Sequence, residues 1–105
     1  MTTVDSPIGE LRLTIDALDR QIVSLLAERT TVVRTLTEYK QDEETVRSPG
    51  RVEEVVAKVR GLAEEFGMPP GIAEATYRTL IGELTRLQLD RLAERQQSAR
   101  EEARP

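Results

Sequence analysis

The sequence predicts an all-α fold in which a long helix, a short helix and a second long helix follow one another. Apolar residues recur at spacings of three and four over most of the chain, as on the buried face of a helix. Aromatic residues make up only 3% of the 105 residues, so Leu, Ile, Val and Ala must form the core. That composition suits packed helices better than a β-sandwich. A chain of this length makes one domain with a thin core.

The first long helix is predicted from about Pro7 to about Asp42. Ser6 is a suitable N-cap, Pro7 suits the first helical position, and no Gly or Pro interrupts the chain from Glu10 to Arg47. A helix of roughly 35 residues is roughly 50 Å long, more than a compact monomer of this size can cover. We therefore expect an oligomer that packs along the apolar stripe of this helix, which consists of Leu11, Ile15, Leu18, Ile22 and Leu25.

Two further helices are predicted after a polar break. Ser48 and Pro49 repeat the start signal of the first helix, and Gly67 is a suitable residue to end the second helix, after Phe66. The third helix starts near Gly71. The predicted organisation is a disordered N-terminus (1–6), a helical domain (7–95) and a charged, flexible tail (96–105).

Several classes of function are excluded or disfavoured by what the chain lacks. It contains no Cys and no His, so thiol nucleophiles, histidine bases and the usual zinc sites are absent, and we expect no metal and no cofactor. The net charge of −4 disfavours a non-specific nucleic-acid binder. No apolar run is long enough to span a membrane, and we expect no signal peptide, because the first residues lack a basic and an apolar region. We expect a soluble cytoplasmic protein.

Three polar side chains are predicted on faces that should be buried. Arg29 lies about 20° from Leu36 around the first helix, and Lys40 lies within about 20° of Arg29. Gln88 falls about 40° from Leu84 on the third helix. Such residues can extend their charged ends to solvent at the edge of a stripe, or fix helix register. However, a buried cation needs an anion, and the stripes offer no acidic residue. A ligand with carboxylates is the alternative.

Arg12 connects this set of residues to the oligomer. It lies roughly 25 Å along the helix from Arg29 and roughly 100° around it, so one small ligand cannot reach both in one chain. A second, antiparallel copy can bring them together. The other interpretation of Arg12 is a solvated helix residue.

These residues carry a resemblance to a known family. The chain resembles the all-helical chorismate mutases over about Ile8 to Arg95, nearly its whole folded part. The pattern is Leu11-Arg12-Leu13-Thr14-Ile15-Asp16-Ala17-Leu18-Asp19, then Leu25-Leu26-Ala27-Glu28-Arg29, then Lys40, extended by Arg51 and Gln88.

The resemblance implies an intertwined homodimer of three-helix chains that binds a small dicarboxylate in two shared active sites. Arg29 would bind one carboxylate, and Arg12 from the partner chain the other. Lys40 and Gln88 would donate hydrogen bonds to the ether oxygen, and Arg51 would add positive potential. Chorismate rearranges to prephenate without proton transfer, so fixed cations and an amide are sufficient for catalysis.

Departures from the family pattern concern the residues that would contact the substrate ring. Ser48 and Val52 stand where acidic residues are expected, and Leu84, with Thr85 beside it, stands where a serine is expected. The slightly short loop and the segment Pro49-Gly50-Arg51-Val52 resemble those of isochorismate pyruvate lyase and of 4-amino-4-deoxychorismate mutase. The alternatives are thus a mutase acting on chorismate or its 4-amino analogue, a lyase with the same carboxylate-binding residues, and a non-catalytic helical dimerisation module.

Overall fold

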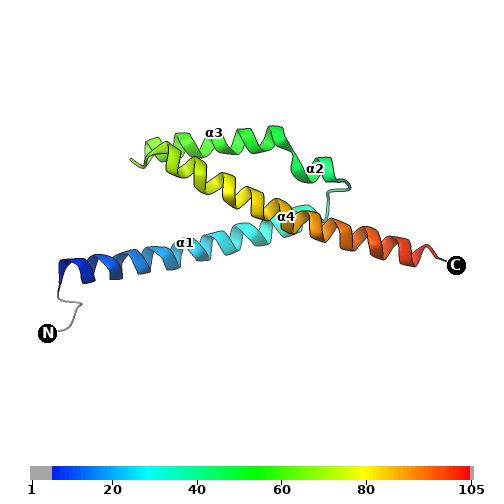
Figure 1. Cartoon of the computed structure of the whole chain (residues 1–105), viewed down its shortest axis with the longest axis horizontal. Coiled ribbons are helices and arrows are strands. Elements are labelled where there is room, and N and C mark those ends of the chain that lie inside the picture. The colour runs from blue at the N-terminus through cyan, green and yellow to red at the C-terminus, as the bar shows by residue number, and fades with distance from the viewer. Residues whose placement is uncertain (1–5, 105) are drawn as a thin grey trace. The chain divides into compact units, whose positions relative to one another are not determined.

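A computed structural model describes residues 6–104, and over this range the chain is helical with no strand. The elements are α1 (Pro7–Thr37), α2 (Glu43–Arg47), α3 (Pro49–Glu65) and α4 (Pro70–Glu102) (Figure 1). This confirms the all-α class and the order long, short, long. The chain divides into two units, one up to Val32 and one from Val33, and each is described by itself. Most of the N-terminus predicted to be disordered lies outside the described residues.

Helix α1 begins as the sequence predicts and ends five residues earlier. The backbone N–H of Gly9 donates to Ser6 Oγ over 2.9 Å, which makes Ser6 the N-cap. After Thr37 the helix tightens, and the N–H of Lys40 donates to the carbonyl of Thr37, three residues back, over 3.1 Å. The chain then starts a new helix at Asp42, so the expected end of the first helix was misplaced.

The short helix α2 was not expected from the sequence. Its N-cap is Asp42, whose Oδ1 accepts hydrogen bonds from both the backbone N–H and the hydroxyl of Thr45, each over 2.7 Å. These bonds hold the pKa of Asp42 below its ordinary value. The expected capping role of Ser48 is wrong, because its hydroxyl donates back to the carbonyl of Thr45 and makes no cap bond with α3.

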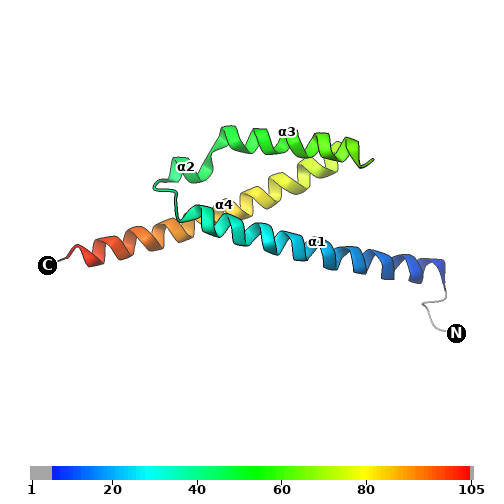
Figure 2. The same cartoon turned by 180° about the vertical axis from the view of Figure 1, so that it is seen from behind.

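Helices α3 and α4 form a hairpin, seen from both sides in Figures 1 and 2. Gly67 adopts a left-handed φ of 76°, as expected of a residue that ends a helix. The N–H of Met68 donates to the carbonyl of Ala63 over 2.8 Å, and the N–H of Gly67 donates to the carbonyl of Glu64 over 3.2 Å. These two bonds form the Schellman pattern.

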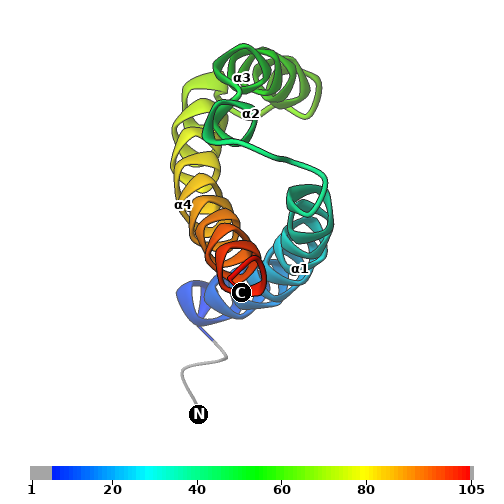
Figure 3. The ribbon, with the colours of Figure 1, turned by 90° about the vertical axis from the view of Figure 1, so that its right-hand side faces the viewer.

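The core lies beside this turn, and α2 packs on α4 (Figure 3). The core consists of Val59, Ala63 and Ala73, with Val55 and Tyr77 packed against them.

Helix α4 ends later than the sequence predicts. Helix α4 continues to Glu102, whereas the sequence places a flexible tail after residue 95. Its last turns are exposed and held by local bonds such as that from Gln97 Nε2 to Glu101 Oε1, over 2.9 Å.

The apolar stripe of α1 is exposed in the single chain, with Leu18 and Ile22 retaining 51% and 52% of their surface. None of the described helices is long and apolar enough to cross a membrane.

Candidate active site

Lys40 and Gln88, both predicted site residues, contact each other directly. The Lys40 ammonium donates to Gln88 Oε1 over 2.8 Å. Gln88 is buried on α4, and Lys40 lies half-buried in the turn that follows α1. Two residues that are 48 positions apart are thus brought to one place, as the predicted inward faces require.

Lys40 is a desolvated cation without a carboxylate beside it. No ion pair of Lys40 is present within residues 6–104, although most basic side chains of α3 and α4 have one. Burial lowers the pKa of Lys40 below its ordinary value of 10.5, because desolvation disfavours the charged form. The ammonium has three protons and one of them is used by Gln88, so two can be donated to a ligand.

Thr37 supports Gln88 and was missed by the sequence analysis. It is the most buried side chain of the core, and its Oγ1 lies 3.1 Å from Gln88 Oε1 and 2.7 Å from the carbonyl oxygen of Val33. The amide oxygen of Gln88 therefore faces Thr37 and Lys40. Because Lys40 and Thr37 contact the oxygen, the two amide protons remain available to a ligand.

Arg95 was also missed as a site residue. Its guanidinium donates to two main-chain carbonyls at the end of α1, those of Thr37 over 2.7 Å and Lys40 over 2.5 Å. Arg95 follows Gln88 by seven residues on α4, which places both on nearly one face of that helix. This spacing is the signal in the sequence that could have indicated it.

Val52 and Thr85, predicted to contact the substrate ring, line one groove between α3 and α4. The groove has a volume of about 350 Å³. Its acidic residue, Glu53, is held by Arg78 in two bonds of 3.0 Å, so this carboxylate is already paired. The lining residues are Arg47, Pro49, Val52, Glu53, Arg78, Ile81, Gly82 and Thr85.

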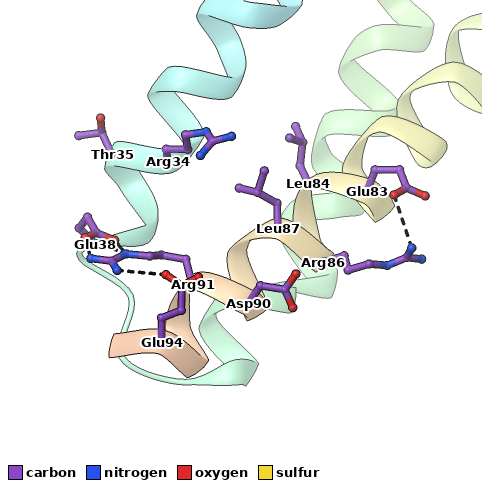
Figure 4. Close-up of a pocket in the computed structure, with 10 residues that line it drawn as sticks. All are labelled: Arg34, Thr35, Glu38, Glu83, Leu84, Arg86, Leu87, Asp90, Arg91 and Glu94. Atoms are coloured by element: carbon purple, nitrogen blue, oxygen red, sulfur yellow. Dashed lines mark hydrogen bonds and ion pairs between the residues drawn. The ribbon is translucent and has the colours of Figure 1, made fainter. Parts of the chain in front are cut away.

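Leu84 faces a different groove, so the structure separates it from Thr85. This second groove, about 770 Å³, lies between α4 and the end of α1 (Figure 4). Leu84 and Leu87 project into it from α4, and its rim carries the ion pair between Arg91 and Glu38, over 2.6 Å. This bond holds the pKa of Glu38 below its ordinary value.

The remaining predicted residues belong to other parts of the chain than Lys40 and Gln88. Arg51 is exposed on α3 and pairs with Glu54 over 3.5 Å. Ser48 lies half-buried between α2 and α3. Arg12, exposed, and Arg29, half-buried, belong to the unit that ends at Val32.

Comparison with known proteins assigns the family. The family model described as chorismate mutase type II matches residues 11–89. The chain belongs to the chorismate mutase type II family. It is therefore an enzyme of the chorismate mutase type, an isomerase that acts on a small molecule. Among curated proteins, none matches the chain.

The match to chorismate mutase type II extends over every site residue that the sequence analysis selected. It begins one residue before Arg12 and ends one residue after Gln88. The segment that follows, which includes Arg95, lies outside the match although it contacts the Lys40 turn. Part of the surroundings of the candidate site thus lies outside the matched segment.

Proposed function

We propose that this chain catalyses the [3,3] rearrangement of chorismate, or of its close analogue 4-amino-4-deoxychorismate. The observation that carries the proposal is the half-buried Lys40 ammonium, which has Gln88 as its partner and no carboxylate. A cation in such a place is costly unless an anionic ligand completes the site.

The rearrangement suits these donors. The ether C–O bond breaks while a new C–C bond forms, no proton moves, and negative charge develops on the ether oxygen. Lys40 and the amide protons of Gln88 stabilise that charge, and they are held before the reaction starts. Each donor needs only to be positioned, so neither a base nor a nucleophile is required.

The two carboxylates of the substrate need further cations, and we propose Arg29 together with Arg12 of a second copy. The exposed stripe of α1 supports a homodimer, because an isolated helix with such a face would be poorly stable in water. Shared active sites follow from this assignment, since each site uses Arg12 of the opposite chain. Arg51 is proposed to add positive potential at a greater distance, from its exposed position on α3.

Substrate specificity is proposed to depend on the groove that contains Val52 and Thr85, with Ser48 at the start of α3 and Leu84 on α4. A hydroxyl on the ring requires polar partners, and Val52 supplies none. The second candidate function is an isochorismate pyruvate lyase with the same carboxylate-binding residues, because its substrate has the ring hydroxyl at a different position and the groove offers no free carboxylate for the hydroxyl of chorismate.

The test is to incubate the purified chain separately with chorismate, isochorismate and 4-amino-4-deoxychorismate. Products are separated by chromatography, because the mutase products have the same mass as their substrates. Prephenate, or its amino analogue, above the uncatalysed rate supports the mutase, and pyruvate released from isochorismate indicates the lyase. If no substrate reacts, the proposal fails and the chain is a dimerisation module.

The matched variants are Lys40→Ala and Lys58→Ala. Lys58 is the only other lysine and is exposed on α3. Lys40→Ala and Arg29→Ala should abolish turnover while circular dichroism still reports a helical protein, whereas Lys58→Ala should retain the activity. Near-normal turnover in Lys40→Ala would show that the proposed site is wrong.

A further inference from the structure

Arg95 joins α4 to the turn that carries Lys40. Its Nη1 donates to the carbonyl of Thr37 over 2.7 Å and its Nη2 to that of Lys40 over 2.5 Å. The Thr37 carbonyl also accepts the N–H of Lys40 over 3.1 Å and has a second lone pair for Arg95, and the Lys40 carbonyl belongs to the turn after α1. The side chain is only 20% exposed, and the Glu38 carboxylate lies 3.8 Å from Nη1. Arg95 is therefore an ordered residue with three contacts to one short segment.

Gln88 and Arg95 hold the same segment from one face of α4. Seven residues place them about 20° apart around the helix and about 10 Å apart along it. Gln88 fixes the ammonium end of Lys40, and Arg95 fixes its backbone. From Glu38 to Lys40, each backbone N–H donates to the carbonyl three residues back over 3.1 to 3.2 Å, as in a 3₁₀ turn. The hydrogen-bond geometry of such turns is poorer than that of an α-helix, so the segment needs external support to keep one conformation.

We propose that Arg95 is a positioning residue, which fixes the backbone of Lys40 so that its ammonium stays on Gln88 in the geometry that the reaction needs. The inference rests on the proposed function. A guanidinium suits this role because its planar fork donates in two directions at once, whereas a lysine at this position would reach one carbonyl. Displacement of a catalytic group by about 1 Å can reduce the rate about a hundredfold.

Arg91 provides the matched control. It lies one turn before Arg95 on α4 and binds the same short segment through the carboxylate of Glu38, but it donates to no main-chain carbonyl of that segment. Arg91→Ala therefore removes a similar charge and a similar contact. Arg95→Ala alone removes the support of the Lys40 backbone.

The kinetic experiment compares Arg95→Ala, Arg95→Lys and Arg91→Ala in the full chain. We expect kcat to fall at least tenfold in Arg95→Ala and less in Arg95→Lys, with KM nearly unchanged, because other residues bind the carboxylates. Added guanidinium at about 50 mM, too dilute to unfold most domains, should restore part of the kcat of Arg95→Ala and have no effect on Arg91→Ala. A purely structural role would give no rescue. Equal kcat in the Arg95→Ala and Arg91→Ala variants would overturn the inference.

A second readout does not depend on turnover. The chain has two lysines, so ¹³C labelling at lysine Cε gives two NMR signals, and exposed Lys58 is the internal reference. In the wild-type chain the Lys40 signal should differ from that of Lys58. It should move toward the Lys58 position in Arg95→Ala and stay in place in Arg91→Ala.

The two readouts separate the two hypotheses. A chain that converts none of the three substrates, yet shows this shift, disproves the proposed function and leaves Arg95 as the residue that positions Lys40. A Lys40 signal that is the same in Arg95→Ala and the wild type overturns the inference, whether or not the chain is active.

Discussion

Lys40 gives the candidate site its dependence on pH. Burial lowers its pKa below 10.5, and the unfolded chain has no such burial. Between the lowered pKa and 10.5 the unfolded chain therefore holds a proton that the folded chain has lost. Stability rises with pH in that interval, because the cost of burying the charge disappears.

Activity should change in the opposite direction. The reaction needs the ammonium form, so kcat/KM, which reports the free enzyme, should fall as pH rises through the lowered pKa of Lys40. The measurement is a profile of kcat/KM from neutral pH to about pH 11, which covers the ordinary range of lysine. If kcat/KM stays constant up to 10.5, Lys40 is not the cation that catalysis uses.

Thr37 allows a second test at the level of single residues. Thr37→Val keeps the shape and removes the hydroxyl that lies 3.1 Å from Gln88 Oε1. We expect about 1 kcal/mol less stability in urea unfolding and about a fivefold lower kcat, since a neutral hydrogen bond is lost while Lys40 still binds Gln88.

The control for this test is Thr76→Val. The hydroxyl of Thr76 donates only to the carbonyl of Ile72, over 2.8 Å, on the exposed side of α4. Its kcat should match the wild type. Equal kcat in the Thr37 and Thr76 variants would mean that the hydroxyl of Thr37 does not orient the amide.

Helical periodicity places Lys40 and Gln88 on inward faces, and the structure brings their side chains into contact. It did not select Thr37 or Arg95 as their supports. Thr37 resembles the other threonines of α1 in the sequence, and only its contact with α4 distinguishes it. Arg95 acts on backbone carbonyls, and these are set by where α1 ends.

Among the elements, the turn between α3 and α4 and a polar break after the first helix were predictable, but the exact end of α1 and the short helix α2 were not. Gly67 ends α3 as expected because few other residues adopt its left-handed φ of 76° at low cost. The end of α1 contains no Gly or Pro and depends instead on the Asp42 cap of α2, with Thr45 as donor. The sequence contains this cap, but the continuous apolar pattern favoured a longer helix.

Two glycine substitutions test this account of the elements. Gly67→Ala should lower the free energy of unfolding by about 1–2 kcal/mol, because the new side chain meets no atom within 4 Å but must adopt a left-handed backbone. Gly61→Ala, in the middle of α3 and equally free of contacts, should raise it by about 0.5–1 kcal/mol. Urea unfolding measures both. A stabilising Gly67→Ala would contradict the assigned turn.

At the scale of the whole molecule, the exposed stripe of α1 predicts a dimer. Leu18→Glu places a charge in the stripe, and Arg20→Glu places one about 200° around the same helix. Sedimentation at several concentrations should show Leu18→Glu as a monomer or a much weaker dimer and Arg20→Glu as unchanged. A monomeric wild-type chain would exclude the shared sites.

The length and apolar stripe of the first helix predict an oligomer, but they do not predict its arrangement. An apolar stripe indicates that another surface covers it, but it does not indicate which surface that is. The role proposed for Arg12 therefore depends on the family rather than on the periodicity.

Complementation between chains tests the central claim most directly, because it requires catalysis and shared sites together. Arg12→Ala and Lys40→Ala chains, each inactive alone, are unfolded together and refolded as an equal mixture. About half of the dimers are then mixed, each with one intact site, so about a quarter of the wild-type chorismate turnover should return. A mixture as inactive as its two components would contradict the proposed active site.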